Sequence, residues 1–464
     1  MAEIKAKLSP RDEAFLHRSL YGTMWKVILT VGTPLALYQG MSQLFAMLDT
    51  MMASHISKES VSAVAYLAQL SSILSSVGGG LAVGAGIQIS RAYGEGNFPL
   101  VRRRVSSLYF ISFLSGVLIM VSILPFVDRF LHLAGTPEEL ITVGARYFRV
   151  ELCGMVVRFL NNVYIAVERA RGNSRRIMML NFLVIGVKLS LTALFVYGLN
   201  GDLVMIAIAS LISQAALFLF ALRFSFGNDD GAFCFSPKAI ALNRRVTAPM
   251  INQSVPVIAE KALFAFGKTV VNSMCTIYGA VMVGAMGVSN NLGGVTTMPQ
   301  NGFQEGAAAI ISQNFGAGKY RRVVSAFFSA LIINAILGAV ISGIELWQID
   351  FFAGLFDSGS PDFHRMIVLV YRYEALGAVP LGINAAVMAL LYGLGKTRLT
   401  LALNFSRVFI FRIPVFWFLQ HFTNIGEASV GIVMMVSNTS VAVTAVIVAA
   451  VILHRFRKDH IGHF

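Results

Sequence analysis

Ionisable side chains interrupt several long apolar stretches of this sequence, and they are the residues that could do chemistry. Asp49, Lys188, Glu260 and Lys268 each lie inside such a stretch or at its end. A charge at bilayer depth costs about 2.5 to 3.5 kcal/mol on insertion scales, so such a residue is retained for a function or is masked by a partner. A carboxylate in a low-dielectric environment holds a proton more tightly than it does in water. Asp49 is therefore the leading candidate for a site that binds a proton or another cation. The alternative is that its carboxylate simply faces water.

Glu260 and Lys268 form a second candidate group. They are eight residues apart in one apolar stretch, so on a helix they lie on about the same face. Both could line a substrate cavity, for which Asn384 is a further candidate, or they could belong to a masked ion-pair network. Arg407 adds a further positive charge, and basic residues are not outnumbered by acidic ones inside the apolar stretches. A cavity this basic suits an anionic substrate better than a cationic one.

Aromatic and methionine side chains near the first apolar stretch could supply a deformable cavity wall. Tyr38, Met41 and Phe45 recur there at helical spacing. Packing, or contact with lipid, is the alternative for each of them.

The elements that carry these residues are membrane helices. The chain has 464 residues, of which 56% are hydrophobic and only 13% are charged, whereas about 25% are charged in a typical soluble domain. Twelve stretches reach the roughly 20 apolar residues that a membrane span needs. They are continuously apolar rather than alternating, which predicts an all-α polytopic membrane protein instead of a β-barrel.

The distribution of the net charge of +14 predicts the orientation. Lys and Arg concentrate in the two tails and in the even-numbered loops, so the positive-inside rule places both termini in the cytoplasm. We expect an integral protein of the plasma membrane, which in a bacterium is the cytoplasmic membrane. Anionic lipid headgroups account for the basic surplus, and nucleic acid is not an expected partner. The three cysteines are scattered and indicate neither a disulfide framework nor a metal cluster.

The second half of the sequence repeats the first at an offset of about 222 to 223 residues. Examples are the pairs Gly80 and Gly302, Gly84 and Gly306, Glu151 and Glu374, Asn161 and Asn384, and Asn181 and Asn404. Six spans in each half give the halves the same orientation, and paired repeats of this kind are typical of transporters. We expect an N-terminal tail at residues 1–23, an N-lobe at 24–223, a linker at 224–245, a C-lobe at 246–454 and a C-terminal tail at 455–464. Pro34 and Pro256, also 222 apart, predict matching helix bends.

Several loops resemble those of the multidrug and toxic compound extrusion (MATE) family. The strings that carry the resemblance are GIQISRAYGEGNFPLVRRR from Gly86, AAIISQNFGAGKYRRV from Ala308, LDTMMAS from Leu48, GNSR from Gly172 and GLGKTR from Gly393. The resemblance covers nearly the whole chain. It implies two six-helix lobes, an amphiphilic and usually cationic organic substrate, and export driven by inward flow of H⁺ or Na⁺. It also implies that Asp49 corresponds to the cation site of the N-lobe.

The sequence departs from the family pattern in the fifth helix. Where the family commonly carries an Asn and an Asp, this chain has Lys188 and Thr192. A lysine there could take the place of the cation and pair with Asp49, which favours H⁺ over Na⁺. Asn161 and Asn181 could add polar oxygens to this site, although structural hydrogen bonds between helices explain such pairs equally well.

The sequence therefore predicts a secondary active exporter that works by alternating access. Besides the coupling ion we expect no cofactor and no metal. We expect a monomer in the lipid bilayer that binds a small amphiphilic molecule, for which a positive charge is one option. One alternative is a flippase for a lipid-linked or anionic substrate of the same exporter superfamily. An enzyme is not expected, because the sequence has no HExxH, GxSxG or GxxxxGK[ST] string.

Overall fold

The computed structural model describes residues 6–54, 58–134, 136, 138–199, 201–225, 231–356 and 360–460. Within these ranges the regular elements are helices, and one isolated parallel β-bridge joins Lys7 to Gly231. The chain divides into two compact units. Unit 1 comprises Met1–His17 and Leu44–Ala262, and unit 2 comprises Arg18–Gln43 and Leu263–Phe464.

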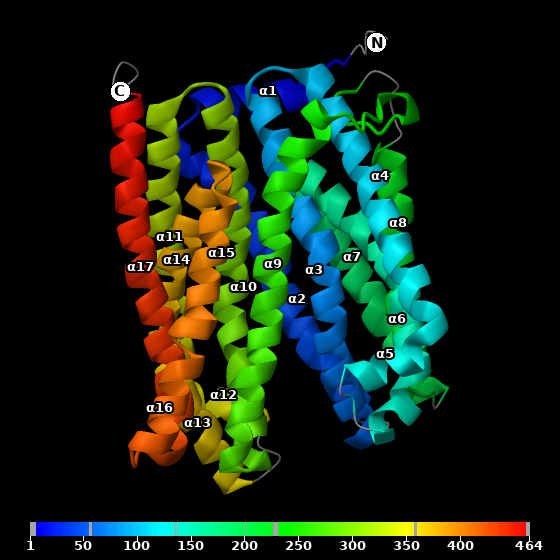
Figure 1. Ribbon diagram of the computed structural model, residues 1–464, viewed down its shortest axis with the longest axis vertical. Helices are drawn as coiled ribbons and strands as arrows, with labels where there is room; N and C mark the ends of the chain where they lie inside the picture. The colour runs from blue at the N-terminus through cyan, green and yellow to red at the C-terminus, as the bar shows by residue number, and fades with distance from the viewer. Residues whose placement is uncertain are drawn as a thin grey trace. The chain divides into compact units, whose positions relative to one another are not determined.

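Unit 1 is built around α6. Its helices are α3 (Lys58–Gly94), α4 (Phe98–Ile123), η1 (Leu124–Phe126), α5 (Val127–Leu133), α6 (Glu138–Ala170), α7 (Ser174–Ala193), the π-helical turn η2 (Leu194–Gly198), α8 (Leu203–Ser225), η3 (Pro237–Ala239) and the first part of α9 (Arg244–Cys275). Helix α6 packs against α3, α4 and α8, as Figure 1 shows within this unit. Phe148 and Phe159 of α6 are fully buried in the apolar core of this unit.

Unit 2 is built around α14. Its helices are the first part of α2 (Met24–Ser54), η4 (Thr276–Tyr278), α10 (Ala280–Gly316), α11 (Tyr320–Trp347), α12 (Ile349–Gly354), α13 (Pro361–Leu376), α14 (Ala378–Gly393), α15 (Thr397–Phe405), the π-helical turn η5 (Ser406–Ile410), α16 (Ile413–Phe422), η6 (Gly426–Ala428) and α17 (Ser429–Asp459). Helix α14 packs against α10, α11 and α17 (Figure 1). Its side chains from Ala385 to Leu391 are therefore all buried.

Eight helices are long and apolar enough to span a membrane, and the bent pair α13 and α14 makes a ninth span, by length and composition in the described residues. The three other long helices are α2, α9 and α10, with 31, 32 and 37 residues. At 1.5 Å per residue each is longer than the roughly 30 Å of a bilayer core. The twelve predicted spans thus correspond to helices, and α9 is less apolar because it carries Glu260, Lys261 and Lys268.

The sequence repeat is visible in one close helix crossing within each unit. In unit 1, a Cβ added to Gly80 of α3 would lie 2.7 Å from the backbone nitrogen of Ile258 in α9. In unit 2, a Cβ added to Gly302 of α10 would lie 2.5 Å from the backbone nitrogen of Ala36 in α2. Gly80 and Gly302 are repeat partners, and so are Ala36 and Ile258 at the same offset. The absence of a side chain at these glycines lets each helix pair approach backbone to backbone.

Both prolines that predicted helix bends lie inside long helices. Pro34 is in α2 and Pro256 is in α9, and each helix continues past its proline. A functional bend at these positions stays a prediction.

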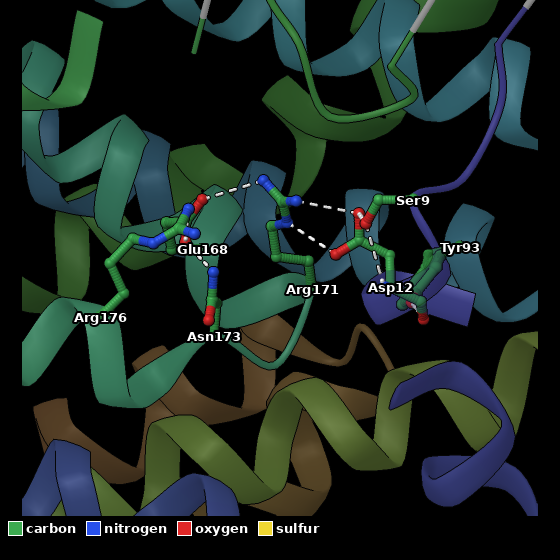
Figure 2. Close-up of polar contacts among 7 residues, drawn as sticks. All are labelled: Ser9, Asp12, Tyr93, Glu168, Arg171, Asn173 and Arg176. Atoms are coloured by element: carbon green, nitrogen blue, oxygen red, sulfur yellow. Dashed lines mark hydrogen bonds and ion pairs between the residues drawn. The ribbon is translucent and has the colours of Figure 1, made fainter. Parts of the chain in front are cut away.

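The predicted N-terminal tail contains a short helix, α1 (Pro10–Tyr21). Ser9 and Asp12 cap its start, because the Ser9 hydroxyl donates to the Asp12 carboxylate over 2.6 Å and accepts from the Asp12 backbone N–H over 3.2 Å. In unit 1, Arg171 donates from Nε and Nη2 to the two Asp12 oxygens over 2.8 and 2.9 Å, and Figure 2 shows this fork. Tyr93 donates to the backbone carbonyl of Asp12. We call this set the N-terminal cluster.

A second carboxylate completes the N-terminal cluster. Glu168 accepts from Arg171 at 3.1 Å, from Arg176 at 3.3 Å and from the Asn173 amide at 2.7 Å (Figure 2). Burial by itself lowers the pKa of the Arg171 guanidinium, but Glu168 and Asp12 outweigh burial, so the net direction of the pKa is upward. The guanidinium stays charged, and the pair with Asp12 is an ion pair that is largely removed from water.

The predicted linker is packed onto unit 1 where it is described. Ser106 and Ser107 of α4 hold it: the Ser106 hydroxyl accepts from the Ser236 backbone N–H, and Ser107 bonds with both backbone groups of Ala241. Phe233 is buried against the ring of Tyr93, with the ring centroids 5.0 Å apart. This segment is therefore part of the fold of unit 1 rather than a free connection.

Candidate functional site

Asp49 lies in the last turns of α2, and its side chain is outside the described residues. The predicted contact between Asp49 and Lys188 therefore stays a prediction. Lys188 lies half-buried on α7, which also carries Asn181 and Thr192.

The amide groups predicted for this site are engaged in hydrogen bonds of the fold. Asn161 of α6 donates to the backbone and side-chain oxygens of Gln214 in α8, over 3.0 and 2.8 Å. Asn181 donates to the carbonyl of Ile177 in its own helix. The oxygen Oδ1 of Asn161 and the hydroxyl of Thr192 are buried and have no hydrogen-bond partner in the described part of the chain. Among the residues predicted for this site, these two oxygens are groups that a bound proton donor or cation could still engage.

Arg158, another charge inside unit 1, is neutralised within its own helix. Its Nη1 lies 2.7 Å from Oε2 of Glu151, and its Nη2 donates to the Glu151 backbone carbonyl over 3.0 Å. The side chains are only 25% and 10% exposed, so this is a masked pair.

The equivalent position in unit 2 is arranged differently. Glu374 is the repeat partner of Glu151, but Leu381 stands where Arg158 stands in the first half. Ser289 of α10 donates to the Glu374 carboxylate. Gly293 leaves room for this carboxylate, because an added Cβ would lie 2.9 Å from Glu374 Oε1. The charged partners of Glu374 must therefore come from other helices.

Three cations supply that charge: Lys268 of α9, Arg407 of η5 and Arg412, which precedes α16. Each of them interacts electrostatically with Glu374, and Lys268 also interacts with both arginines. We call Lys268, Glu374, Arg407, Arg412 and Asn438 the unit 2 cluster.

Asn438 of α17 connects the two arginines. Its side-chain oxygen accepts from Arg407 Nε and Nη2, over 3.2 and 2.9 Å, and from Arg412 Nη2 over 3.1 Å. Arg412 also donates to the Ser437 hydroxyl over 3.0 Å, and the Arg407 guanidinium lies 5.2 Å from the centre of the Phe264 ring. The two guanidinium groups thus share one neutral acceptor, the Asn438 oxygen.

The unit 2 cluster lies beside a break in a membrane helix. Helices α13 and α14 meet at Gly377 with a bend of 44°. Pro380 lacks an N–H and its ring crowds the carbonyl four residues earlier, so the proline explains the break. The equivalent helix α6 has Val157 in place of Pro380 and runs unbroken. An added Cβ at Gly377 would lie 2.7 Å from the Asn438 amide nitrogen, so Asn438 packs directly against the break.

The other predicted cavity residues are spread over both units. Glu260 is buried and belongs to the part of α9 in unit 1, whereas Lys268 on the same helix belongs to unit 2. Asn384 of α14 is buried, and its Oδ1 has no partner among the described residues. Tyr38, Met41 and Phe45 of α2 are half-buried.

Sequence reasoning missed Glu374 and Asn438. The repeat could have indicated Glu374, because its partner Glu151 has an arginine seven residues later and Glu374 has a leucine there. A second carboxylate, Glu345 of α11, was also missed. It accepts from Thr296 over 2.7 Å and from the Tyr371 hydroxyl, and it interacts electrostatically with Glu374.

The two-fold organisation agrees with comparison to known proteins. The MatE family model matches residues 34–194 and again residues 256–418, which together make up most of the chain. The chain belongs to the MATE family of transporters. The two matched segments begin 222 residues apart, which is the offset of the internal repeat.

Curated relatives and a solved structure support the same assignment. The probable multidrug resistance protein YoeA of Bacillus subtilis is 24% identical over 69% of this chain and 70% of its own length. The multidrug export protein MepA of Staphylococcus aureus is 23% identical over 83% of this chain and 80% of its own length. The outward-facing structure of a multidrug resistance MATE family transporter of the MOP superfamily has a TM-score of 0.91 at 20% identity, covering 97% of this chain and 100% of that one. The prediction of an all-helical, twelve-span MATE fold with two six-helix lobes is confirmed.

Proposed function

We propose that this MATE transporter is a secondary active exporter that couples the efflux of amphiphilic organic compounds to the entry of H⁺. The relatives named above as multidrug resistance and multidrug export proteins support the substrate class. On this proposal the protein acts as a monomer in the plasma membrane with both termini in the cytoplasm, and its substrates are small molecules that include cationic ones. The coupling ion is its only cofactor, and proton binding shifts the balance between two lobe arrangements by binding one of them more tightly.

Lys188 carries the preference for H⁺ over Na⁺. It lies half-buried on α7, four residues before the buried Thr192, at a place where the family commonly has a neutral or acidic ligand. An ammonium in this helix repels Na⁺, because two unit charges about 4 Å apart repel by several kcal/mol at the effective dielectric of a protein. A proton that neutralises Asp49 requires no further ligands and no room of its own, whereas a bound Na⁺ would require both beside the ammonium.

The test is transport by the purified protein in vesicles. Efflux of rhodamine 123 is measured under an imposed pH gradient and, separately, under an imposed Na⁺ gradient. We expect the pH gradient to drive efflux in the wild type and not in Asp49→Asn, with a changed pH dependence in Lys188→Asn. Efflux driven by Na⁺ alone, or an Asp49→Asn variant with wild-type activity, refutes the coupling scheme.

A second function is favoured by the unit 2 cluster, which contains three cations and one carboxylate. A flippase or exporter of a lipid-linked or anionic substrate would use such a site. Under this alternative rhodamine 123 is not moved by either gradient, and an anionic amphiphile is moved instead.

A further inference from the structure

The unit 2 cluster differs from Arg158 and Arg171 of unit 1, because its two arginines form no ion pair among the described residues. Arg158 is paired with Glu151 at 2.7 Å, and Arg171 is paired with both Asp12 and Glu168. Arg407 and Arg412 instead donate to the amide oxygen of Asn438 and, for Arg412, to the Ser437 hydroxyl. In the part of the chain that the structure describes, neither guanidinium forms an ion pair with a carboxylate.

Lys268 adds a third positive charge to those of the two arginines. Within the described residues its ammonium has no hydrogen-bond or ion-pair partner, although it interacts electrostatically with Glu374 and with both arginines. Among the described residues, two acids take part in the electrostatics of the cluster: Glu374 from α13, hydrogen-bonded by Ser289, and Glu345 from α11, which is hydrogen-bonded by Thr296 and Tyr371 and interacts with Glu374. Three cations therefore outnumber the acids even when the more distant Glu345 is counted.

A surplus of buried positive charge is costly unless something compensates it. Two guanidinium groups present ten N–H donors in planar forks, and four hydrogen bonds engage them among the described residues. Carboxylate, phosphate and sulfonate groups match these forks in charge and geometry. Lys268, Arg407 and Glu374 are each half-buried, and Arg412 is buried.

The position of the cluster at a helix break adds an independent argument. Discontinuous membrane helices form substrate and ion sites in many transporters, because the break places polar groups at bilayer depth. Here the break at Gly377 occurs only in the second half of the repeat, and Asn438, which holds both arginines, packs against it.

We propose that Arg407, Arg412 and Lys268 form a binding site in unit 2 for the anionic group of an amphiphilic molecule. This inference rests on the export function proposed above and names the chemical group that the second candidate function requires. Glu374 lies beside the site, where it orients the cations and limits the site to ligands with one or two negative charges. The surplus of cations also disfavours Na⁺ at this site.

The test compares two dyes that share one aromatic scaffold and differ in charge. Fluorescein is anionic and rhodamine 123 is cationic, and their binding to the purified full-length protein is measured by fluorescence polarisation in neutral detergent. We expect Arg407→Gln combined with Arg412→Gln to weaken fluorescein binding at least tenfold and to leave rhodamine 123 binding within about twofold. Arg365→Gln is the matched control, because Arg365 is an exposed arginine of the same unit, paired with Glu427, and its loss should change neither affinity.

A second variant, Asn438→Asp, tests the site in a protein that should fold normally. The new carboxylate still accepts from both arginines while it occupies the site with a fixed negative charge. We expect it to fold with wild-type thermal stability and to lose fluorescein binding at least tenfold. Unchanged fluorescein affinity in both the double arginine variant and Asn438→Asp overturns the proposal.

The anionic group could belong to a membrane lipid or to an exported molecule, and nanodiscs distinguish the two. If phosphatidylglycerol competes with fluorescein in the wild type, compared with phosphatidylcholine alone, the site takes a lipid headgroup. If it does not compete, the site takes the anionic group of a dissolved substrate. Because binding is measured without any gradient, failure of pH-driven efflux would refute the proposed coupling and leave this site standing.

Discussion

Asp12→Asn removes one charge from the N-terminal cluster without changing the shape of the side chain. The carboxylate accepts two hydrogen bonds from Arg171, at 2.8 and 2.9 Å, and one from Ser9, and its side chain is 7% exposed. An Asn oxygen can keep one of the two bonds to Arg171, but as a neutral acceptor. Hydrogen bonds to charged groups contribute about 1.5 to 3 kcal/mol each. Arg171 also retains Glu168, so we expect α1 to lose about 2 kcal/mol of local stability.

Hydrogen–deuterium exchange measures this loss directly, because α1 opens locally before the rest of the protein unfolds. At about 1.4 kcal/mol per tenfold change, 2 kcal/mol corresponds to roughly 30-fold faster exchange of the α1 amides. Glu13→Gln is the matched control, since Glu13 is the exposed neighbour of Asp12 on the same helix. Exchange in Asp12→Asn that stays within threefold of the wild type would refute the claim that this ion pair holds α1.

Gly80→Ala forces α3 away from the backbone of α9, and we expect thermal unfolding to show a free energy of unfolding that is about 1 to 3 kcal/mol lower. Gly186→Ala is the control and should have almost no effect, because an added Cβ at Gly186 meets nothing within 4 Å. Glu151→Gln leaves the largely buried Arg158 without its charged partner, so the same measurement should show a loss of about 3 kcal/mol. Arg149→Ala breaks the ion pair between Arg149 and Asp128, whose side chains are 47% and 56% exposed. Water screens such a pair, so we expect the free energy of unfolding to change by less than about 1 kcal/mol, and a larger loss would contradict this reasoning.

The helices and their duplication could be predicted from the sequence because both depend on local patterns. A continuous run of about 20 apolar residues forms a helix in a bilayer, because a helix satisfies each backbone hydrogen-bonding group within the same segment. The break before α14 was equally open to prediction, since Pro380 is present in the second half and Val157 occupies its place in the first. Helix α1 was not predicted, because a helix of 12 residues is marginal alone and depends on contacts such as that between Asp12 and Arg171.

The sequence also identified Lys268 and Arg407 as candidates, because charged residues in apolar runs are conspicuous. It could not reveal which of the charges are neutralised. Arg158 has its partner seven residues away in one helix, whereas the groups around Glu374 come from α9, α10, η5 and the start of α16. Asn438 is an ordinary polar residue in the last span until the fold places it between two arginines.

Composition and periodicity determined that this chain is a duplicated bundle of membrane helices, because those signals act within single helices. Only the tertiary structure decided which charges are masked and which are available to a ligand, because that depends on side chains that lie far apart in the sequence and meet across helices.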